Sequence, residues 1–474
     1  MMDFINLIIP SLLSEVLIII AILFSILLPI NRTIFFASAS LLSAFLSLIL
    51  LDNNWHDCLM QLFPDIIKSY SNDHRIMNML LIKTVVYFVA SLIFIIFTCY
   101  KVKRKKDISL LLMFSILGYT LILSLNDLIS FYLSVELASI SSYILAASNR
   151  DDLKSSEAGI KYYIIGAVMS AIMLFGLSLI YSFGQYHSID VLFTDISSLN
   201  IGAQLGVLFV IITLFFKLAI FPFHSWAPDV YEGSSNIVTL FFTTIPKLVY
   251  VVFFLGFVHA SLGNNFLITI RAIGIISVFI SAVMALKQTD CKRLLAYSSI
   301  GHMGLVICAM FASDGNIGVD ENYNIIVNYI VIYIITNLGL FAAIIRYKID
   351  DLRNLAGFAK KYPYGAAMLS IFLLSIAGIP PFAGFFVKYE LFKIMLLHNQ
   401  GIMALLLLVA SIISIFYYLK IIAYIYFEPL DEKNIIIQNN TELYTIGRYT
   451  LISLMFYVGL FLTGYIFISN FFNL

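Results

Sequence analysis

Apolar stretches of roughly twenty residues recur from one end of this chain to the other. A helix of about twenty residues is long enough to cross the hydrocarbon core of a bilayer, and only helices and closed barrels satisfy the backbone there. We therefore expect an all-α polytopic membrane protein with about fourteen transmembrane helices. Their predicted cores are residues 11–29, 33–51, 79–100, 108–125, 128–147, 158–183, 201–222, 236–258, 267–286, 294–313, 323–345, 364–394, 402–427 and 449–470.

The composition agrees with this fold class and excludes several functions. Hydrophobic residues make up 61% of the chain and charged residues only 12%, against about 25% charged residues in soluble domains. The formal net charge of +1 indicates no nucleic-acid partner. Neither GxGxxG nor GxxxxGK(S/T) occurs, so nicotinamide, flavin or ATP chemistry would need another chain. The cysteines form no CxxC pair and no cluster with histidine, which predicts buried thiols in place of disulfides or metal ligands. They are Cys58, Cys99, Cys291 and Cys308.

Basic residues collect in alternate loops. The basic loops are 101–106, 150–154, 287–293 and 346–361. In the other set, the loops 126–128, 259–265 and 313–322 contain no lysine or arginine, and Lys68 and Arg75 in the loop 52–78 are minor exceptions. If the helices alternate in direction, all the basic loops fall on one side of the membrane, and the positive-inside rule makes that side cytoplasmic.

Two predicted helices carry both a proline interruption and a lysine. Helix seven has Lys217 near Pro222, and helix twelve has Lys388 after Pro380 and Pro381. The two helices are five apart, so the second enters the bilayer from the opposite face. This arrangement is typical of inverted five-helix repeats, here helices four to eight and nine to thirteen. The order of lysine and proline is reversed between them, so the symmetry is inferred from topology.

This interpretation divides the chain into four parts. Helices one to three occupy residues 1–107, the first repeat 108–258 and the second repeat 259–427, and a loop with helix fourteen occupies 428–474.

Among the ionisable side chains that fall within predicted membrane helices, we single out five as candidates for function: Glu136, Lys217, Lys247, His302 and Lys388. A charge at the centre of a membrane helix costs roughly 2.5–3.5 kcal/mol, so the glutamate and three lysines together would cost on the order of 10–14 kcal/mol if they stood alone. One glutamate cannot pair with three lysines. The excess amines therefore need water or must lose their protons.

An excess of buried amines is suited to proton transfer. A solvated lysine holds its proton too tightly, whereas burial lowers the pKa of a lysine and a nearby carboxylate raises it again. We predict that Glu136 lies close to Lys217 and that this pair opens and closes as the amine releases and takes up a proton. Lys217, Lys247, His302 and Lys388 would then form a lateral proton relay, because chains of ionisable residues mark proton pathways in membranes.

Each relay residue also has a purely structural interpretation. Glu136 and Lys217 could form a structural ion pair, Lys247 could reach an interface, His302 could be a hydrogen-bonded core histidine, and Lys388 could lie nearer to the membrane surface.

Three further residues lie close to these helices. His224 and Pro222, at the interruption in helix seven, are candidates for gating, and His224 could equally be a helix cap. Lys83, at the start of helix three, is interpreted as a side chain that reaches toward the membrane surface.

Four stretches together resemble the antiporter-like membrane subunits of respiratory complex I, the proton-translocating NADH–quinone oxidoreductase. They are SVELASISSYILAA, FKLAIFPFHSWAPDVYEG, LKQTDCKRLLAYSSIGHMG and GIPPFAGFFVKYELF. Such subunits are similar to subunits of multi-chain Na⁺/H⁺ antiporters. The resemblance covers nearly the whole chain, and helices four to thirteen most clearly. The family's helix-five glutamate falls on Glu136, and its lysines of helices seven, eight and twelve fall on Lys217, Lys247 and Lys388. Gly301, before His302, departs from the serine of the family.

The resemblance implies a proton-translocating subunit that itself binds no cofactor. NAD, FMN and iron–sulfur clusters are expected on partner subunits, and quinone (ubiquinone) is a substrate of the whole complex. The implied partners are the other membrane subunits of complex I, both antiporter-like and small, and the lipid bilayer. We expect the bacterial inner membrane as the location, in preference to the mitochondrial inner membrane.

Two other functions stay open on the residues alone. A subunit of a multi-chain cation/proton antiporter would carry nearly the same buried residues, and the subunits that co-purify would distinguish it. A structural spacer, whose charges only lock helix packing, predicts that loss of Lys217 impairs assembly and leaves pumping per electron unchanged.

Overall fold

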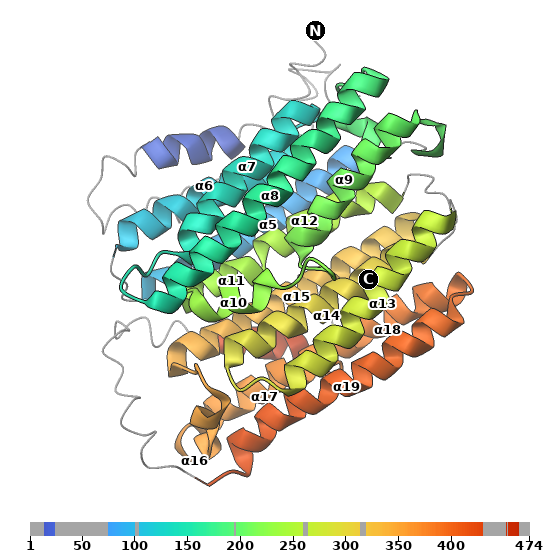
Figure 1. The fold of residues 1–474 in the computed structure, drawn as a ribbon. Coiled ribbons are helices and arrows are strands. Elements are labelled where there is room, and N and C mark those ends of the chain that lie inside the picture. The colour runs from blue at the N-terminus through green and yellow to red at the C-terminus, as the bar shows by residue number, and fades with distance from the viewer. Residues whose placement is uncertain are drawn as a thin grey trace, which may run out of the picture.

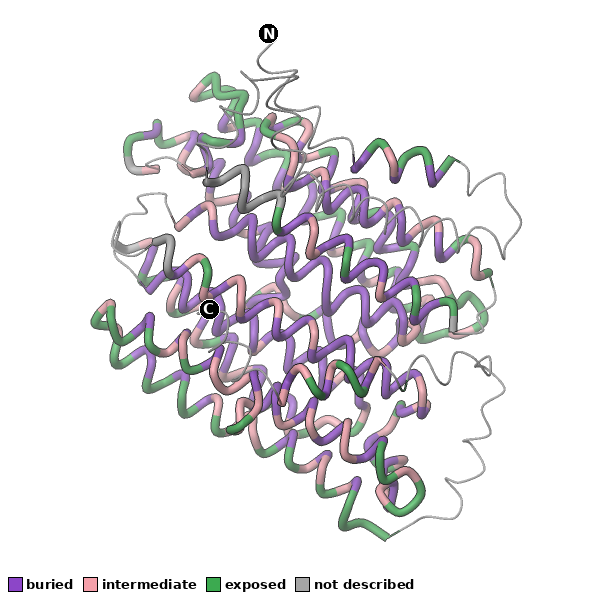
Figure 2. The backbone as a smooth tube through the Cα atoms, turned by 180° about the vertical axis from the view of Figure 1, so that it is seen from behind, coloured by how far each residue is buried: buried purple, intermediate pink, exposed green. Residues whose placement is uncertain are grey.

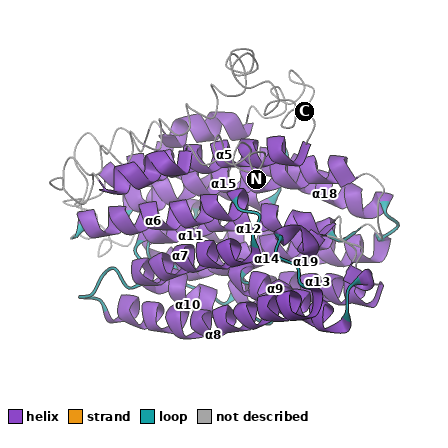
Figure 3. Cartoon of the chain, turned by 90° about the horizontal axis from the view of Figure 1, so that it is seen from above, coloured by secondary structure: helices purple, strands orange, loops and turns teal. Residues whose placement is uncertain are grey.

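A computed structural model describes residues 14–23, 74–99, 104–193, 196–258, 264–312, 319–429, 452 and 454–463. Within these residues the chain forms helices and no named β-strand. The long helices share one general direction and pack side by side into a single bundle (Figures 1 and 3).

The helices of the first half are α5 (His74–Cys99), α6 (Lys105–Ser124), α7 (Leu128–Ala146), α8 (Leu153–Gly184), α9 (Ile201–Leu218), α10 (Trp226–Gly233), α11 (Asn236–Thr243) and α12 (Ile245–Leu255). Those of the second half are α13 (Asn264–Leu286), α14 (Cys291–Met310), α15 (Val319–Tyr347), α16 (Phe358–Lys361), α17 (Pro363–Ala377), α18 (Ala383–Leu397) and α19 (Gly401–Tyr426). Short 3₁₀ helices are η1 (Ile189–Phe193), η2 (Ile196–Ser198), η3 (Gly256–Val258) and η4 (Leu352–Leu355).

The described part contains 10 helices that are long and apolar enough to cross a membrane, together with shorter apolar helices at Ser14–Leu23, Pro363–Ala377 and Leu454–Thr463. Every predicted segment except 33–51 coincides at least in part with a described helix, and 33–51 lies outside the described residues. The predicted all-α polytopic class is therefore confirmed. The four-part division of the chain stays a prediction.

Helix eight of the prediction lies at the centre of the bundle. Every residue from Ile237 to Leu255, in α11 and α12, is buried, whereas only 33% of the most apolar 18 residues of α8 and of α19 is buried. Figure 2 shows the same gradient, with buried residues inside and exposed residues on the outer helices and at the helix ends. The exposed side chains of α8 and α19 are mainly apolar, as membrane-facing or subunit-facing helices require.

Two pairs of loops are joined by short antiparallel bridges that correspond to each other. Asp127, before α7, pairs with Ser188, and Asp290, before α14, pairs with Asp351. Both aspartates are N-caps, and their side chains accept hydrogen bonds from the first turns of the fifth and tenth predicted helices. Each bridge is followed by a 3₁₀ helix, η1 or η4. Equivalent contacts recurring five helices apart are what the predicted inverted repeats require.

The interruptions of helices seven and twelve also correspond. α9 ends before Ala219, which has a φ of 59°, and α17 ends before Gly378, which has a φ of 81°. At both sites the residue that follows the left-handed one donates its N–H to the carbonyl five residues earlier. Ile220 N–H donates to the Phe215 carbonyl at 2.9 Å, and Ile379 N–H donates to the Leu374 carbonyl at 3.1 Å. The predicted breaks at the prolines are thus confirmed.

Helix eight is also interrupted, which the sequence prediction of one segment over 236–258 missed. α11 ends at Thr243 and α12 begins at Ile245, because Thr244 leaves the helical conformation with φ −115° and ψ −88°. Pro246 explains the interruption, since proline has no N–H to continue the helical hydrogen bonds. Lys247 follows this second break directly.

Candidate functional site: lysines at the helix breaks

Each of the three breaks leaves a carbonyl without its helical donor. Leu218 and Ala377 are the last residues of α9 and α17, so no later residue of the helix bonds their carbonyls. Phe242 lies four residues before Pro246, which has no N–H to donate. Each carbonyl receives a side-chain donor instead. Lys247 Nζ lies 2.6 Å from the Leu218 oxygen, the Tyr231 hydroxyl 3.3 Å from the Phe242 oxygen, and Lys388 Nζ 3.1 Å from the Ala377 oxygen.

Lys217 occupies the last turn of α9 and is buried, with 5% of its surface exposed. Its amine donates to Ser139 Oγ at 2.6 Å and to the Tyr143 hydroxyl at 3.4 Å, and it lies 5.6 Å from the centre of the Tyr143 ring. Ser139 is able to accept this bond because its own hydroxyl donates to the backbone of α7. Lys217 is therefore held by neutral hydroxyl groups.

Glu136 is half-buried and lies on the same face of α7 as Ser139 and Tyr143, three and seven residues before them. No ion pair within 4.0 Å joins it to Lys217 among the described side chains, although the two charges interact electrostatically. The structure therefore brings Glu136 and Lys217 to one site with the predicted pair open. Glu136 also borders the exposed apolar side chains of α7, including Leu133 and Ile140.

Lys247 and Lys388 make equivalent contacts at the two corresponding breaks. Leu218 precedes Ala219, and Ala377 precedes Gly378, so the two amines bind the same carbonyl of the same motif. The contact that Lys388 makes at the second break is therefore made at the first by Lys247 of helix eight and not by Lys217. A cation is favourable there, since the carboxyl end of a helix carries partial negative charge.

His302 lies in a buried network that joins α14, α15 and α19. Its Nδ1 is 2.6 Å from the Tyr329 hydroxyl and its Nε2 3.3 Å from the Tyr418 hydroxyl, which is bonded in turn to Ser298. A core histidine with satisfied nitrogens is one of the two interpretations left open by the sequence, and the network fits it. The Tyr hydroxyls also supply exchangeable protons on both sides of the ring.

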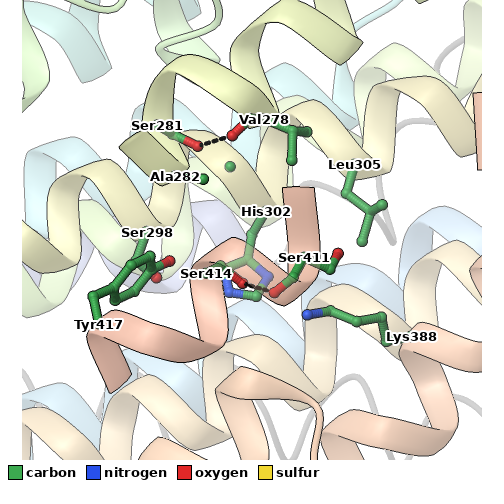
Figure 4. A pocket seen from close by; sticks show the side chains of 11 residues that line it. Val278, Ser281, Ala282, Ser298, His302, Leu305, Lys388, Ser411, Ser414 and Tyr417 are labelled. Carbon is green, nitrogen blue, oxygen red and sulfur yellow. Dashed lines mark hydrogen bonds between the residues drawn. The ribbon is translucent and has the colours of Figure 1, made fainter. Parts of the chain in front are cut away.

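A small cavity of about 20 Å³ separates His302 from Lys388. Lys388 reaches toward it from α18, and Ser411 and Ser414 of α19 also line it (Figure 4). A cavity needs about 10–15 Å³ to hold one water molecule, and this one is walled by several polar groups. These are Ser281, Ser298, His302, Lys388, Ser411, Ser414 and Tyr417.

The five predicted relay residues thus form two groups. Lys217, Lys247 and Glu136 gather around the break after α9, and His302 and Lys388 gather around the cavity next to the break after α17. No hydrogen bond joins Lys247 directly to His302 in the part of the chain that the structure describes.

The two candidate gating residues lie within the first break. Pro222 is exposed, and His224 is half-buried with its ring centre 5.8 Å from that of Phe221. His224 Nδ1 is buried without a hydrogen-bond partner. Neither residue contacts Lys217 among the hydrogen bonds of the described residues.

Sequence reasoning gave no role to the charged residues of α10, which form a cluster of ion pairs. Asp229 pairs with Lys161 of α8 and with Arg293 of α14, each at 2.7 Å. Glu232 pairs with Lys154 at 2.7 Å and with Arg293 at 3.0 Å. We call these five residues the α10 ion-pair cluster. It joins the two repeats at the side that the basic loops predict to be cytoplasmic.

The α10 ion-pair cluster changes how its carboxylates titrate. Burial alone would raise the pKa of Asp229, but the hydrogen bond from Lys161 and the charge of Arg293 hold it below 3.8. Burial would likewise raise the pKa of Glu232, but hydrogen bonds from Lys154 and Arg293 hold it below 4.5. The PDVYEG motif therefore fixes α10 with carboxylates that stay charged at neutral pH.

The prediction that Lys83 reaches toward the membrane surface is wrong. Lys83 is buried, with 1% of its surface exposed, and its amine lies 3.0 Å from Glu15 Oε1. Ser124 also donates to Oε1, at 2.8 Å, and Ser14 donates to the other oxygen at 2.9 Å. Glu15 and Lys83 are far apart in sequence, so no local pattern indicated their pairing.

No cluster of three or more histidine, cysteine or acidic side chains able to hold a metal ion occurs among the described residues. Cys291 and Cys308 are buried free thiols.

Comparison with known proteins identifies the family. The family model described as NADH:quinone oxidoreductase/Mrp antiporter, TM, matches residues 125–414. NADH-quinone oxidoreductase subunit N of Wolbachia sp. subsp. Brugia malayi is 45% identical over 335 residues, which are 68% of this chain and 70% of that protein. The subunit N of Pelagibacter ubique is 38% identical over 331 residues, covering 68% and 69% of the two chains.

Solved structures share the fold. A chain of respiratory complex I from Thermus thermophilus aligns with a TM-score of 0.76 at 22% identity, over 96% of this chain and 97% of that one. A chain of the Mrp complex from Dietzia sp. aligns with a TM-score of 0.72 at 18% identity, over 96% and 94%. The chain therefore belongs to the NADH:quinone oxidoreductase/Mrp antiporter family of transmembrane subunits, in its subunit N branch.

Proposed function

We propose that this chain is the proton-translocating subunit N of a bacterial NADH–quinone oxidoreductase, held in the inner membrane. The observation that carries the proposal is the set of buried lysines at two equivalent helix breaks, in a chain whose relatives are subunits of that complex. NAD, FMN and iron–sulfur clusters would belong to partner subunits, and quinone reduction elsewhere would drive the proton movement here.

In this proposal the protons move laterally along the five relay residues. The Lys217 amine is bonded to the hydroxyls of Ser139 and Tyr143. In the proposal it moves between these hydroxyls and the carboxylate of Glu136, which modulates its affinity for a proton. Lys247 binds the carbonyl of Leu218, the residue next to Lys217 in the chain, so the first two amines share one helix end. His302 and Lys388 continue the path across the polar cavity, which has room for about one water molecule.

The half-exposed position of Glu136 supports a partner subunit against α7. A carboxylate at membrane depth is too costly to leave beside lipid, and Glu136 lies among exposed apolar side chains of that helix. We infer that a neighbouring membrane subunit covers this face and presents a polar or basic group to Glu136. The two gating candidates, His224 and Pro222, would act at the adjoining break.

The alternative of a multi-chain cation/proton antiporter has the fold similarity to the Mrp complex in its favour, at 18% identity. The much higher identity to subunit N proteins supports the first proposal. Co-purification decides between them, because the first function requires peripheral redox subunits in the purified complex and the antiporter requires membrane partners only.

The decisive variant is Lys217→Ala, with assembly checked on native gels. NADH-driven quinone reduction and proton uptake into sealed vesicles are recorded together, and Lys287→Ala, at an exposed loop position, is the matched control. We expect normal assembly with both rates strongly reduced in Lys217→Ala and unchanged in Lys287→Ala. Normal assembly with both rates intact would remove Lys217 from the path, and loss of assembly alone, rescued by Lys217→Arg, would indicate a structural lysine.

A further inference from the structure

The two corresponding breaks place a backbone carbonyl under a buried lysine in the same way. At each break a helix ends, the next residue adopts a left-handed conformation, and the carbonyl just before it accepts the amine. The lysines themselves come from unrelated places, since Lys247 lies on helix eight and Lys388 on the second half of helix twelve. The same lysine–carbonyl contact recurs although the two lysines come from different helices. The feature that the two repeats share is therefore the carbonyl at the helix end, and not the position of the lysine in the sequence.

The carbonyls are suited to a charged amine. The last carbonyls of a helix have no partner within it and form the negative end of its dipole. Leu218 and Ala377 are buried at 0% and 2% exposure, so water competes little for the contact. A protonated amine is therefore held more strongly there than a neutral one.

The left-handed residue sets the position of this carbonyl, and in the second repeat it also touches the lysine. A Cβ on Gly378 would lie 3.1 Å from Lys388 Cδ and 3.4 Å from its Nζ. The φ of 81° adds strain for any residue with a side chain. Glycine at this position leaves the room that the Lys388 side chain occupies.

We propose that Ala219 and Gly378 are positioning residues for proton transfer: each turns the preceding carbonyl, of Leu218 or Ala377, onto Lys247 or Lys388 and so holds the protonated amine at the helix break. This rests on the proposed function, because it concerns the proton carried by the relay lysines. The residue after each broken helix thus tunes how tightly the amine keeps its proton.

Other titratable groups also face Lys388. From α14 it faces His302, across the cavity from α19 it faces Tyr417, and Tyr329 of α15 reaches it through its bond to His302. α17 contributes the Ala377 carbonyl. The variant that tests the proposal leaves all these groups unchanged.

The test is Gly378→Ala in the assembled complex, with the pH profile of NADH-driven proton uptake as the readout. The new Cβ would crowd Lys388 Cδ at 3.1 Å and so move the amine off the carbonyl, which lowers the affinity of the amine for a proton. The alkaline limb of the profile is therefore expected to shift to lower pH by about 0.2–0.7 unit, the size of a helix-end interaction with a cation. Gly401→Ala is the matched control, since nothing lies within 4 Å of a Cβ there. A purely structural glycine would change assembly or rate without moving the profile.

Lys388→Ala separates the two proposals. Loss of proton uptake in Lys388→Ala with a shifted profile in Gly378→Ala supports both. Loss in Lys388→Ala with an unshifted profile in Gly378→Ala overturns the positioning role and leaves the proposed function standing, whereas full uptake in Lys388→Ala overturns both at this break. If Gly378→Ala does not assemble, the same profile of Gly378→Asn decides, because asparagine tolerates the left-handed conformation better.

Discussion

The buried ion pair of Glu15 and Lys83 makes a sharp prediction about stability. Both side chains are almost fully buried, at 2% and 1% exposure, and Ser124 and Ser14 bind the remaining lone pairs of the carboxylate. Removing one charge leaves the other buried without its partner, and breaking such pairs costs about 3–5 kcal/mol. We therefore expect Glu15→Leu and Lys83→Met each to destabilise the folded chain by that amount, a factor of about 150 to 4,000 in the folding equilibrium.

The double variant Glu15→Leu/Lys83→Met tests the reasoning. It leaves no buried charge, and replacing a whole buried pair by apolar groups is often neutral or stabilising. Ser124 also donates to the Thr120 carbonyl at 2.8 Å, so its hydroxyl keeps a partner. The double variant should recover to within about 1 kcal/mol of the wild type, a small fraction of either single loss.

The assay is thermal dissociation of the purified complex in detergent, followed on native gels, together with proton uptake per electron in vesicles. Lys161→Met is the matched control, because its ion pairs are partly exposed and exposed pairs contribute only about 0–1 kcal/mol. Pumping per electron should stay normal in all assembled variants, since the pair lies outside the relay. Single variants as stable as the wild type, or a double variant worse than both, would refute the interpretation.

Two more predictions concern the first repeat. In Gly166→Ala the new Cβ would clash with the Tyr143 hydroxyl, so Tyr143 must shift and its bond to Lys217 is disturbed. Proton uptake should then fall in an assembled complex while Gly401→Ala stays normal. Unchanged uptake would show that Tyr143 does not matter to Lys217. The pKa values of Asp229 and Glu232 are lowered in the folded protein from their ordinary values of 3.8 and 4.5. The α10 ion-pair cluster therefore stabilises the fold at a pH above these ordinary values, and the stabilisation is lost as the pH falls through the lowered pKa values. The dissociation temperature should therefore drop steeply below about pH 4, and less so in Asp229→Asn/Glu232→Gln; an equal drop in that variant would exclude the cluster as the cause.

The sequence by itself determined the helices of the described part and the breaks in helices seven and twelve. It also indicated the burial of Lys217, Lys247, His302 and Lys388, but not that of Lys83. The reason is the bilayer, where a helix must be apolar over about twenty residues and a charge at mid-helix is too costly to be accidental. The proline positions were readable because a missing N–H has the same local effect in any fold. The break in helix eight was as local as the others, since Pro246 causes it, yet it was missed among long apolar neighbours.

Only the tertiary structure decided what each buried charge binds. Lys217 is bonded to Ser139 with the predicted partner Glu136 held apart, Lys247 binds a backbone carbonyl, and Lys83 pairs with a distant glutamate. Partners of this kind depend on how helices far apart in sequence pack and rotate against each other. A carbonyl freed by a proline looks the same in every sequence, and only the packed bundle brings a particular amine to it.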